Sequence, residues 1–196
     1  MIAYHLSSGG QANTVTGDGL LVAAGPVGPQ PPDTCHHDPF SPVPTGDLRI
    51  LDIREDVLCY TGPVLTEPVA PCGPGRLRLC LSSSAARAHL AVAILDVPAA
   101  GSAVLLGEAA VHVSGLRRQA ARTVEVVVPL CATVLDAGHR LRLELYRGRC
   151  ERCPDADTPA VDRLYHDDRE HSTLSIPVVP LTAAGTRDQM TASSSS

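Results

Sequence analysis

The chain has no lysine and no tryptophan, and aromatic residues make up only 3% of its 196 residues. GC-rich coding accounts for the missing lysine, so arginine carries all of the positive side-chain charge apart from histidine. With so few rings, the hydrophobic core has to consist of leucine, valine, alanine and isoleucine. A sugar-binding surface is not expected either, because such sites stack sugar faces on exposed aromatic rings.

Positive charge is also scarce, since 16 basic residues face 21 acidic ones and the net charge is −5. Nucleic-acid binding requires a basic face, so we expect no nucleic-acid partner. The sequence contains no apolar run long enough to cross a bilayer and no signal-peptide pattern, which predicts a cytoplasmic protein without a membrane partner. The seven cysteines are scattered through apolar runs, as expected for reduced, buried thiols rather than a disulfide framework.

What the sequence does contain is a series of short β-rich runs separated by turn residues such as CGPG, PAAG and DAGH. Leucines alternate with polar residues in 76–81 and 140–145, which predicts strands with Leu inward and Arg outward. Helix is expected only as a turn or two within 129–138. The pattern predicts an all-β fold, a β-sandwich of the jelly-roll type with little helix.

The predicted organisation is a single β-domain over residues 1–180. Within it, the proline-rich stretch 25–45 is expected to form an extended strap without regular structure. Residues 181–196 are small and polar, which predicts a disordered tail.

Five stretches, in order, resemble the C-terminal domain of the X-Pro dipeptidyl-peptidase and cocaine-esterase family of serine hydrolases. They are YHLSSGGQANTVTGDGLL, PPDTCHHDPFSPVPT, REDVLCYTGPVLTEPVAPCGPGRLRLCLSSSA, DAGHRLRLELY and YHDDREHSTLSIPVVP, which together span roughly residues 3 to 180. The resemblance implies a jelly roll of the galactose-binding-domain-like kind. One departure is RGRCERCPDADTPAVD, which stands where the family has a loop rich in Asn, Pro and Gly.

In the family, an α/β-hydrolase domain with the Ser-Asp-His triad precedes this domain. The resemblance therefore implies that this chain lacks the catalytic half and serves as a non-catalytic accessory, docking or oligomerisation module. Its expected partner is a separate α/β-hydrolase chain or a second copy of itself. The strap at 25–45 and the altered loop at 148–162 are expected to adjoin the docking face.

No serine has the surroundings of a hydrolase nucleophile, which needs the sharp strand-to-helix turn G-x-S-x-G. The nearest match is Ser114 in VHVSG, but His112 replaces the first glycine. Ser82, Ser83 and Ser84 end a predicted strand without a preceding glycine. We therefore expect no catalytic residue among these serines.

The histidines offer little more. His166 and His171 lie near Ser172 and three acidic residues, but one short loop does not supply the converging directions that a triad needs. These acidic residues are Asp167, Asp168 and Glu170. His139, in AGHRLRL, is interpreted as a structural turn residue.

The alternative is a stand-alone enzyme or a metal- or redox-binding protein centred on Cys150 and Cys153. This C-x-x-C supplies half of a tetrahedral zinc site. Cys35 with His36 or His37 would complete it if the strap met the 148–158 loop. No second C-x-x-C exists, so no metal or cofactor is assigned, and the four-ligand possibility stays open.

Overall fold

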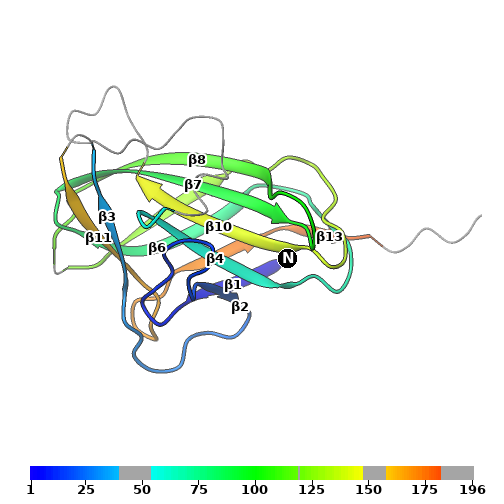
Figure 1. Ribbon diagram of the computed structural model, residues 1–196, viewed down its shortest axis with the longest axis horizontal. Coiled ribbons are helices and arrows are strands. Elements are labelled where there is room, and N and C mark those ends of the chain that lie inside the picture. Colours follow the sequence, from blue (N-terminus) through cyan, green and yellow to red (C-terminus); the bar gives the residue numbers. More distant parts are fainter. Residues whose placement is uncertain (40–53, 119, 148–157, 182–196) are drawn as a thin grey trace, which may run out of the picture.

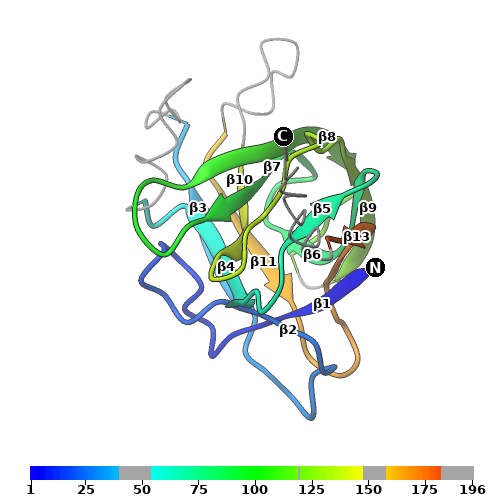
Figure 2. The same cartoon turned by 90° about the vertical axis from the view of Figure 1, so that its right-hand side faces the viewer.

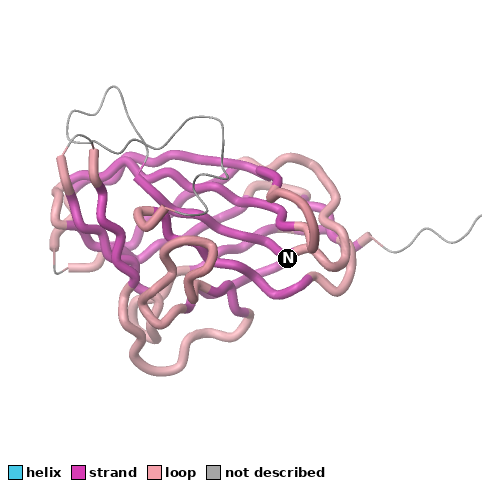
Figure 3. The backbone as a smooth tube through the Cα atoms, viewed as in Figure 1, coloured by secondary structure: helices cyan, strands magenta, loops and turns pink. Residues whose placement is uncertain are grey.

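The computed structural model describes residues 1–39, 54–118, 120–147 and 158–181. These residues form strands, turns and loops and contain no helix (Figure 3). Accordingly, the described part of the chain has no helix of the length and apolarity needed to cross a membrane. The all-β prediction is confirmed.

Thirteen strands follow one another along the described residues. They are β1 (Ile2–Ser7), β2 (Leu20–Val22), β3 (Asp33–His37), β4 (Val57–Val64), β5 (Val69–Pro71), β6 (Gly75–Ser83), β7 (Arg87–Val97), β8 (Val104–Ser114), β9 (Arg122–Val128), β10 (Arg140–Arg147), β11 (Ala160–Tyr165), β12 (Thr173–Ile176) and β13 (Val178–Pro180).

Eleven strands form the main sheet, in the order β3-β11-β6-β12-β1-β2-β4-β10-β7-β8, and β9 also pairs with β6. The strands curve around a common interior, with β10, β7 and β8 on one side and β6, β12 and β1 on another (Figures 1 and 2). The small β5–β13 sheet lies at one end. This arrangement is the β-sandwich expected from the sequence, while the jelly-roll strand order stays a prediction.

The leucine alternation sets the direction of two central strands. Leu77, Leu79 and Leu81 of β6 are buried in the core, as are Leu141, Leu143 and Leu145 of β10. Arg76 and Arg140 are exposed on the opposite face, and Arg78 is half-buried. This burial confirms the predicted register of both strands. The register is fixed because a slip by one residue would bury these arginines.

The outer face of β10 differs from the expected solvated surface. Glu144 lies on that face but is fully buried. Its carboxylate oxygen Oε1 lies 3.9 Å from Nη1 of the Arg142 guanidinium. On the leucine face, Arg147 at the end of the strand is also buried and pairs with Asp162. The alternation of leucine with charged residues in the sequence indicated which face of β10 each side chain lies on. It did not indicate how deeply the charged side chains are buried.

Two predictions about connections were wrong. The strap contains a regular strand, because residues 33–37 lie between Pro32 and Pro39 and keep every backbone N–H for pairing with β11. Residues 129–135 form no helical turn. Instead Cys131 N donates to Leu106 O, and Leu135 bridges to Val69, so the segment runs extended across its neighbours.

Candidate functional site

A buried polar cluster surrounds Asp33, at the start of β3. We call it the Asp33 cluster; its side chains are Ser8, Gln30, Asp33, Tyr60 and His166. They come from the β1–β2 loop, the strap, β3, β4 and the segment after β11, so the cluster joins distant parts of the chain.

Asp33 accepts hydrogen bonds from four groups. Tyr60 Oη donates at 2.5 Å, and the Ala12 N–H donates at 2.9 Å. Ser8 Oγ lies 2.7 and 2.8 Å from the two carboxylate oxygens, and His166 Nε2 lies 2.9 Å away. A carboxylate satisfied by this many donors is stable in the interior despite its charge.

Both ring nitrogens of His166 face acceptors. Nε2 faces Asp33, and Nδ1 lies 2.8 Å from the side-chain amide oxygen Oε1 of Gln30. The ring thus bridges Asp33 and Gln30. The side chains of His166 and Asp33 are both fully buried where they meet.

This combination of serine, histidine and aspartate is not a catalytic triad. In a triad, the serine and the carboxylate occupy opposite nitrogens of the imidazole, so that the histidine can accept the serine proton. Here Ser8 Oγ lies 3.1 Å from Nε2, the same nitrogen that binds Asp33. Ser8 also accepts the Gly10 N–H at 2.9 Å, so its hydroxyl is fully used within the fold.

The cluster shifts two pKa values. Burial raises the pKa of Asp33, but the hydrogen bonds from His166, Tyr60, Ala12 and Ser8 together lower it by more. The pKa of Asp33 therefore lies below its ordinary value. Burial, with the nearby Asp33 charge, raises the pKa of Tyr60 well above its usual value. The cluster thus favours an ionised aspartate beside a neutral tyrosine.

The sequence singled out His166 but missed its partners. Asp33 stood in the proline-rich strap, and Ser8 and Gln30 stood in turn-like segments without any local motif. The neighbours that the sequence did suggest have other roles. Ser172 Oγ donates to Tyr165 O, and Asp167 accepts the N–H groups of residues 169 and 170 in a tight turn.

His171 does not join this cluster, since its ring packs against His5 with centroids 5.9 Å apart. His139 closes the turn before β10, because Nδ1 lies 2.9 Å from both carboxylate oxygens of Asp96 and its carbonyl accepts Leu65 N. Gly138, just before it, has a φ of 92°. These contacts support the interpretation of His139 as a structural turn residue.

The serines at the ends of β6 and β8 are occupied or isolated. Ser83 Oγ accepts from Arg147, Ser84 Oγ accepts Val161 N, and Ser82 Oγ lies 3.1 Å from Tyr165 Oη. Ser114 is exposed at the end of β8, which leads into a turn rather than a helix. None of them has the geometry of a nucleophile elbow.

Cys35 and His36 are separated by the alternation of β3. Cys35 is buried and donates to Asp56 O at 3.0 Å, and burial raises its pKa to about 12. His36 is exposed on the other face of the strand. Cys150 and Cys153 lie outside the described residues. Among the residues that the structure does describe, no three His, Cys, Asp or Glu side chains gather as a metal site.

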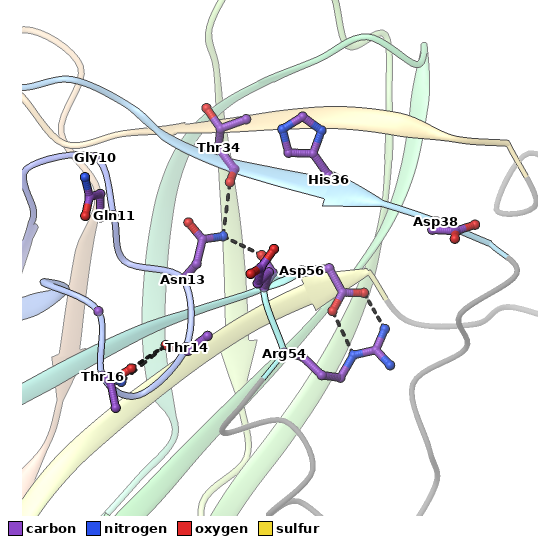
Figure 4. Close-up of a pocket in the computed structure, with 12 residues that line it drawn as sticks. Gly10, Gln11, Asn13, Thr14, Thr16, Thr34, His36, Asp38, Arg54 and Asp56 are labelled. Atoms are coloured by element: carbon purple, nitrogen blue, oxygen red, sulfur yellow. Dashed lines mark hydrogen bonds and ion pairs between the residues drawn. The ribbon is translucent and has the colours of Figure 1, made fainter.

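A hollow of about 910 Å³ opens between β3, the 10–17 loop and residues 54–56 (Figure 4). The Asn13 amide spans it, donating to Thr34 O at 3.1 Å and to Glu55 O at 2.5 Å. Arg54 and Asp56 form a two-point ion pair beside it, at 2.7 and 2.5 Å. Among the described residues that line the hollow there is no Phe, Tyr or Trp.

Comparison with solved structures identifies the fold. The chain superposes on an α-amino acid ester hydrolase with a TM-score of 0.71 at 20% identity, covering 88% of this chain and 36% of that one. An aminopeptidase from a marine sediment Thaumarchaeota archaeon gives a TM-score of 0.73 at 19% identity, with 90% and 37% coverage. A CocE/NonD family hydrolase from Staphylococcus aureus gives a TM-score of 0.65 at 10% identity, with 90% and 36% coverage.

Sequence comparison gives the family. Cocaine esterase of Rhodococcus sp. (strain MB1 Bresler) is 32% identical over 165 residues, which cover 72% of this chain and 29% of the esterase. The chain thus spans about a third of the length of the relatives that it matches. The family model for the X-Pro dipeptidyl-peptidase C-terminal non-catalytic domain matches residues 4–151. The chain therefore belongs to this family of non-catalytic C-terminal domains.

Proposed function

We propose that this chain is an accessory module that docks onto an α/β-hydrolase catalytic unit and performs no hydrolysis itself. The single observation that carries the proposal is the geometry of the Asp33 cluster. Its serine and its aspartate share one nitrogen of His166, and Ser8 Oγ is engaged by Asp33 and Gly10. An acyl-transfer enzyme needs a free nucleophile beside a base, together with oxyanion donors.

Further support comes from the relatives, in which this domain makes up about a third of a longer hydrolase or peptidase. The Asp33 cluster ties together five segments of the chain through side-chain contacts, which supports a structural role for the domain. The cytoplasmic location predicted from the sequence stays a prediction.

The test has two parts. The purified chain is assayed with p-nitrophenyl acetate and a Gly-Pro chromogenic amide, alone and with Ser8→Ala and Ser114→Ala variants. It is then co-expressed with α/β-hydrolase chains from its source organism that lack their own β-domain. We expect no turnover by the chain alone, and a stable complex with a hydrolase whose activity or thermal stability increases.

Turnover by the chain alone that disappears in Ser8→Ala or Ser114→Ala would overturn the proposal. So would the failure of every such hydrolase chain to bind. The two serines serve as controls for each other, because one is in the buried cluster and the other is exposed at a strand end.

A further inference from the structure

Two histidines meet on the outer face of the main sheet. His5 lies between the buried Tyr4 and Leu6 of β1, so strand alternation places its side chain on the opposite face. His171 comes two residues before β12. The two ring centroids lie 5.9 Å apart, and the ring planes are tilted by 50°. Both histidines are half-buried, so small ions can reach them from solvent.

The backbone holds the two rings at this spacing. β1 pairs with β12 in a register that places His5 opposite Thr173, two residues from His171. From the next strand, β6, Arg78 Nη1 donates to His171 O at 3.2 Å. The pair is therefore positioned by the sheet and not only by the contact between the rings.

The nitrogens of this pair differ from those of the other buried histidines. His166 and His139 each lie within hydrogen-bond distance of a carboxylate. His5 Nδ1 is buried, and it has no hydrogen-bond partner in the described part of the chain. A buried polar atom without a partner costs free energy, and coordination of a metal ion satisfies an imidazole nitrogen.

The spacing of the two rings suits a shared metal ion. A zinc–nitrogen bond is about 2.0–2.1 Å long, and the centre of an imidazole ring lies about 1.1 Å behind the bonding nitrogen. Two rings on one four-coordinate ion therefore have centroids about 5–6 Å apart. The observed 5.9 Å lies in this range.

The surroundings of the pair admit a cation. The turn DDRE at 167–170, directly before His171, has three acidic residues and one basic residue, and the whole chain has a net charge of −5. Arg78 is a positive charge nearby, and its guanidinium binds the His171 carbonyl. Gly25 leaves part of the His5 ring uncovered, since an added Cβ would stand 3.5 Å from Cε1 and 3.6 Å from Nε2.

We propose that His5 and His171 bind a zinc ion, with water molecules in its remaining coordination positions. Neutral imidazole is the commonest metal ligand in proteins, and it suits zinc. The ion links the first strand of the chain to the segment that leads into β12. Because the two ligands are 166 positions apart, they meet only in the folded chain, and zinc binding stabilises that state by mass action.

Two histidines make a weaker site than the four ligands of a structural zinc centre. Among the described residues, no third His, Cys, Asp or Glu side chain joins them. Half of the binding free energy of a four-ligand site corresponds to a dissociation constant between about 1 and 200 µM. The site is therefore reversible and responds to the zinc concentration.

The experiment is calorimetric titration of the full chain with zinc chloride. The parent chain carries Cys150→Ser and Cys153→Ser, so that the C-x-x-C contributes no ligand. His5→Gln and His171→Gln each remove one ligand in this parent.

The matched control is His89→Gln. Like His5, His89 is half-buried and has a buried Nδ1 without a hydrogen-bond partner in the described residues. Its strand, β7, is separated from β1 by β2, β4 and β10. The control therefore makes the same change at a similar histidine outside the proposed site.

We expect the parent and His89→Gln to bind zinc equally, and both His5→Gln and His171→Gln to bind at least about tenfold more weakly. Zinc at ten times the dissociation constant is expected to raise the melting temperature of the first two chains by about 3–6 °C. The proposal is overturned by the absence of zinc binding below about 1 mM. Equal binding by all four chains overturns it too, as does a loss in only one of His5→Gln and His171→Gln.

Zinc-soaked crystals of the parent provide a second measurement that does not depend on how the variants fold. Zinc scatters X-rays anomalously, so a bound ion gives a peak in the anomalous difference map. We expect this peak between the His5 and His171 rings, and a map without it at that place would overturn the proposal.

Discussion

At the scale of single residues, Asp33 concentrates the polar interactions of the interior. Its carboxylate accepts from a phenol, a hydroxyl and a backbone amide, and it lies within hydrogen-bond distance of an imidazole nitrogen. Each donor is itself buried or half-buried, so a substitution that removes the Asp33 carboxylate would leave these donors without their acceptor. The effect of a substitution here depends on these partners as much as on the aspartate itself.

Asp33→Asn is expected to destabilise the fold by about 2–4 kcal/mol, because its amide cannot replace the buried carboxylate that accepts from Tyr60, Ser8 and the Ala12 N–H and contacts His166. Urea unfolding monitored by circular dichroism measures this change. Glu125→Gln, on the exposed face of β9, is the control and is expected to stay within about 0.5 kcal/mol of the wild type. Equal losses in the two variants would contradict the role of the Asp33 cluster.

The same aspartate makes stability depend on acidity. Because the pKa of Asp33 is lower in the folded chain than in the unfolded chain, the unfolded state takes up this proton first as pH falls. Its stabilisation is complete above the unfolded value of about 3.9 and is lost as pH falls through the folded value. Urea midpoints measured from pH 6 to pH 2 are expected to fall less steeply in Asp33→Asn than in the wild type.

Thiol reactivity provides an independent check on burial. Burial raises the pKa of Cys35 to about 12, and Cys59 and Cys80 are also buried, whereas Cys72 and Cys131 are exposed. In a chain with Cys150→Ser and Cys153→Ser, a chromogenic disulfide reagent at mildly alkaline pH is expected to modify two thiols rapidly. The other three should react only after unfolding, and rapid modification of a third thiol would contradict this burial.

At the scale of strands, period-two alternation was the most informative pattern in the sequence. It predicted the direction of β6 and β10 because a buried leucine row cannot change places with arginines. It did not predict β3, since proline residues on both sides of 33–37 obscured a short stretch with free N–H groups. Proline excludes pairing only at its own position, and the strap prediction extended this exclusion too far.

Leu143→Ala tests the placement of β10. Leu143 is fully buried and pairs between Tyr60 of β4 and Ile94 of β7. Its truncation is expected to cost about 2–5 kcal/mol in the free energy of unfolding, through lost burial and the cavity left behind. Val127→Ala, on the exposed side of β9, should change little. A loss below about 0.5 kcal/mol at Leu143 would contradict this position in the core.

At the scale of the whole molecule, the fold could be predicted and the polar cluster could not. Alternation and the ordered resemblance both depend on local sequence, which was enough for the sandwich and its family. The Asp33 cluster depends on residues separated by up to 158 positions, from Ser8 to His166. No local spacing in the sequence indicates a contact over this distance. The sequence therefore pointed only to His166, and it suggested Ser172 as the neighbouring serine instead of Ser8.

The pairing of β1 with β12 has a consequence for how the chain folds. Ile2 lies opposite Ile176, so nearly the whole described chain has to be synthesised before this edge of β1 finds its partner. Contacts between residues so distant in sequence close large loops, and domains dominated by them fold in milliseconds to seconds rather than microseconds. During translation, β1 therefore leaves the ribosome long before β12 exists, and for that time the β12 edge of β1 is available to chaperones.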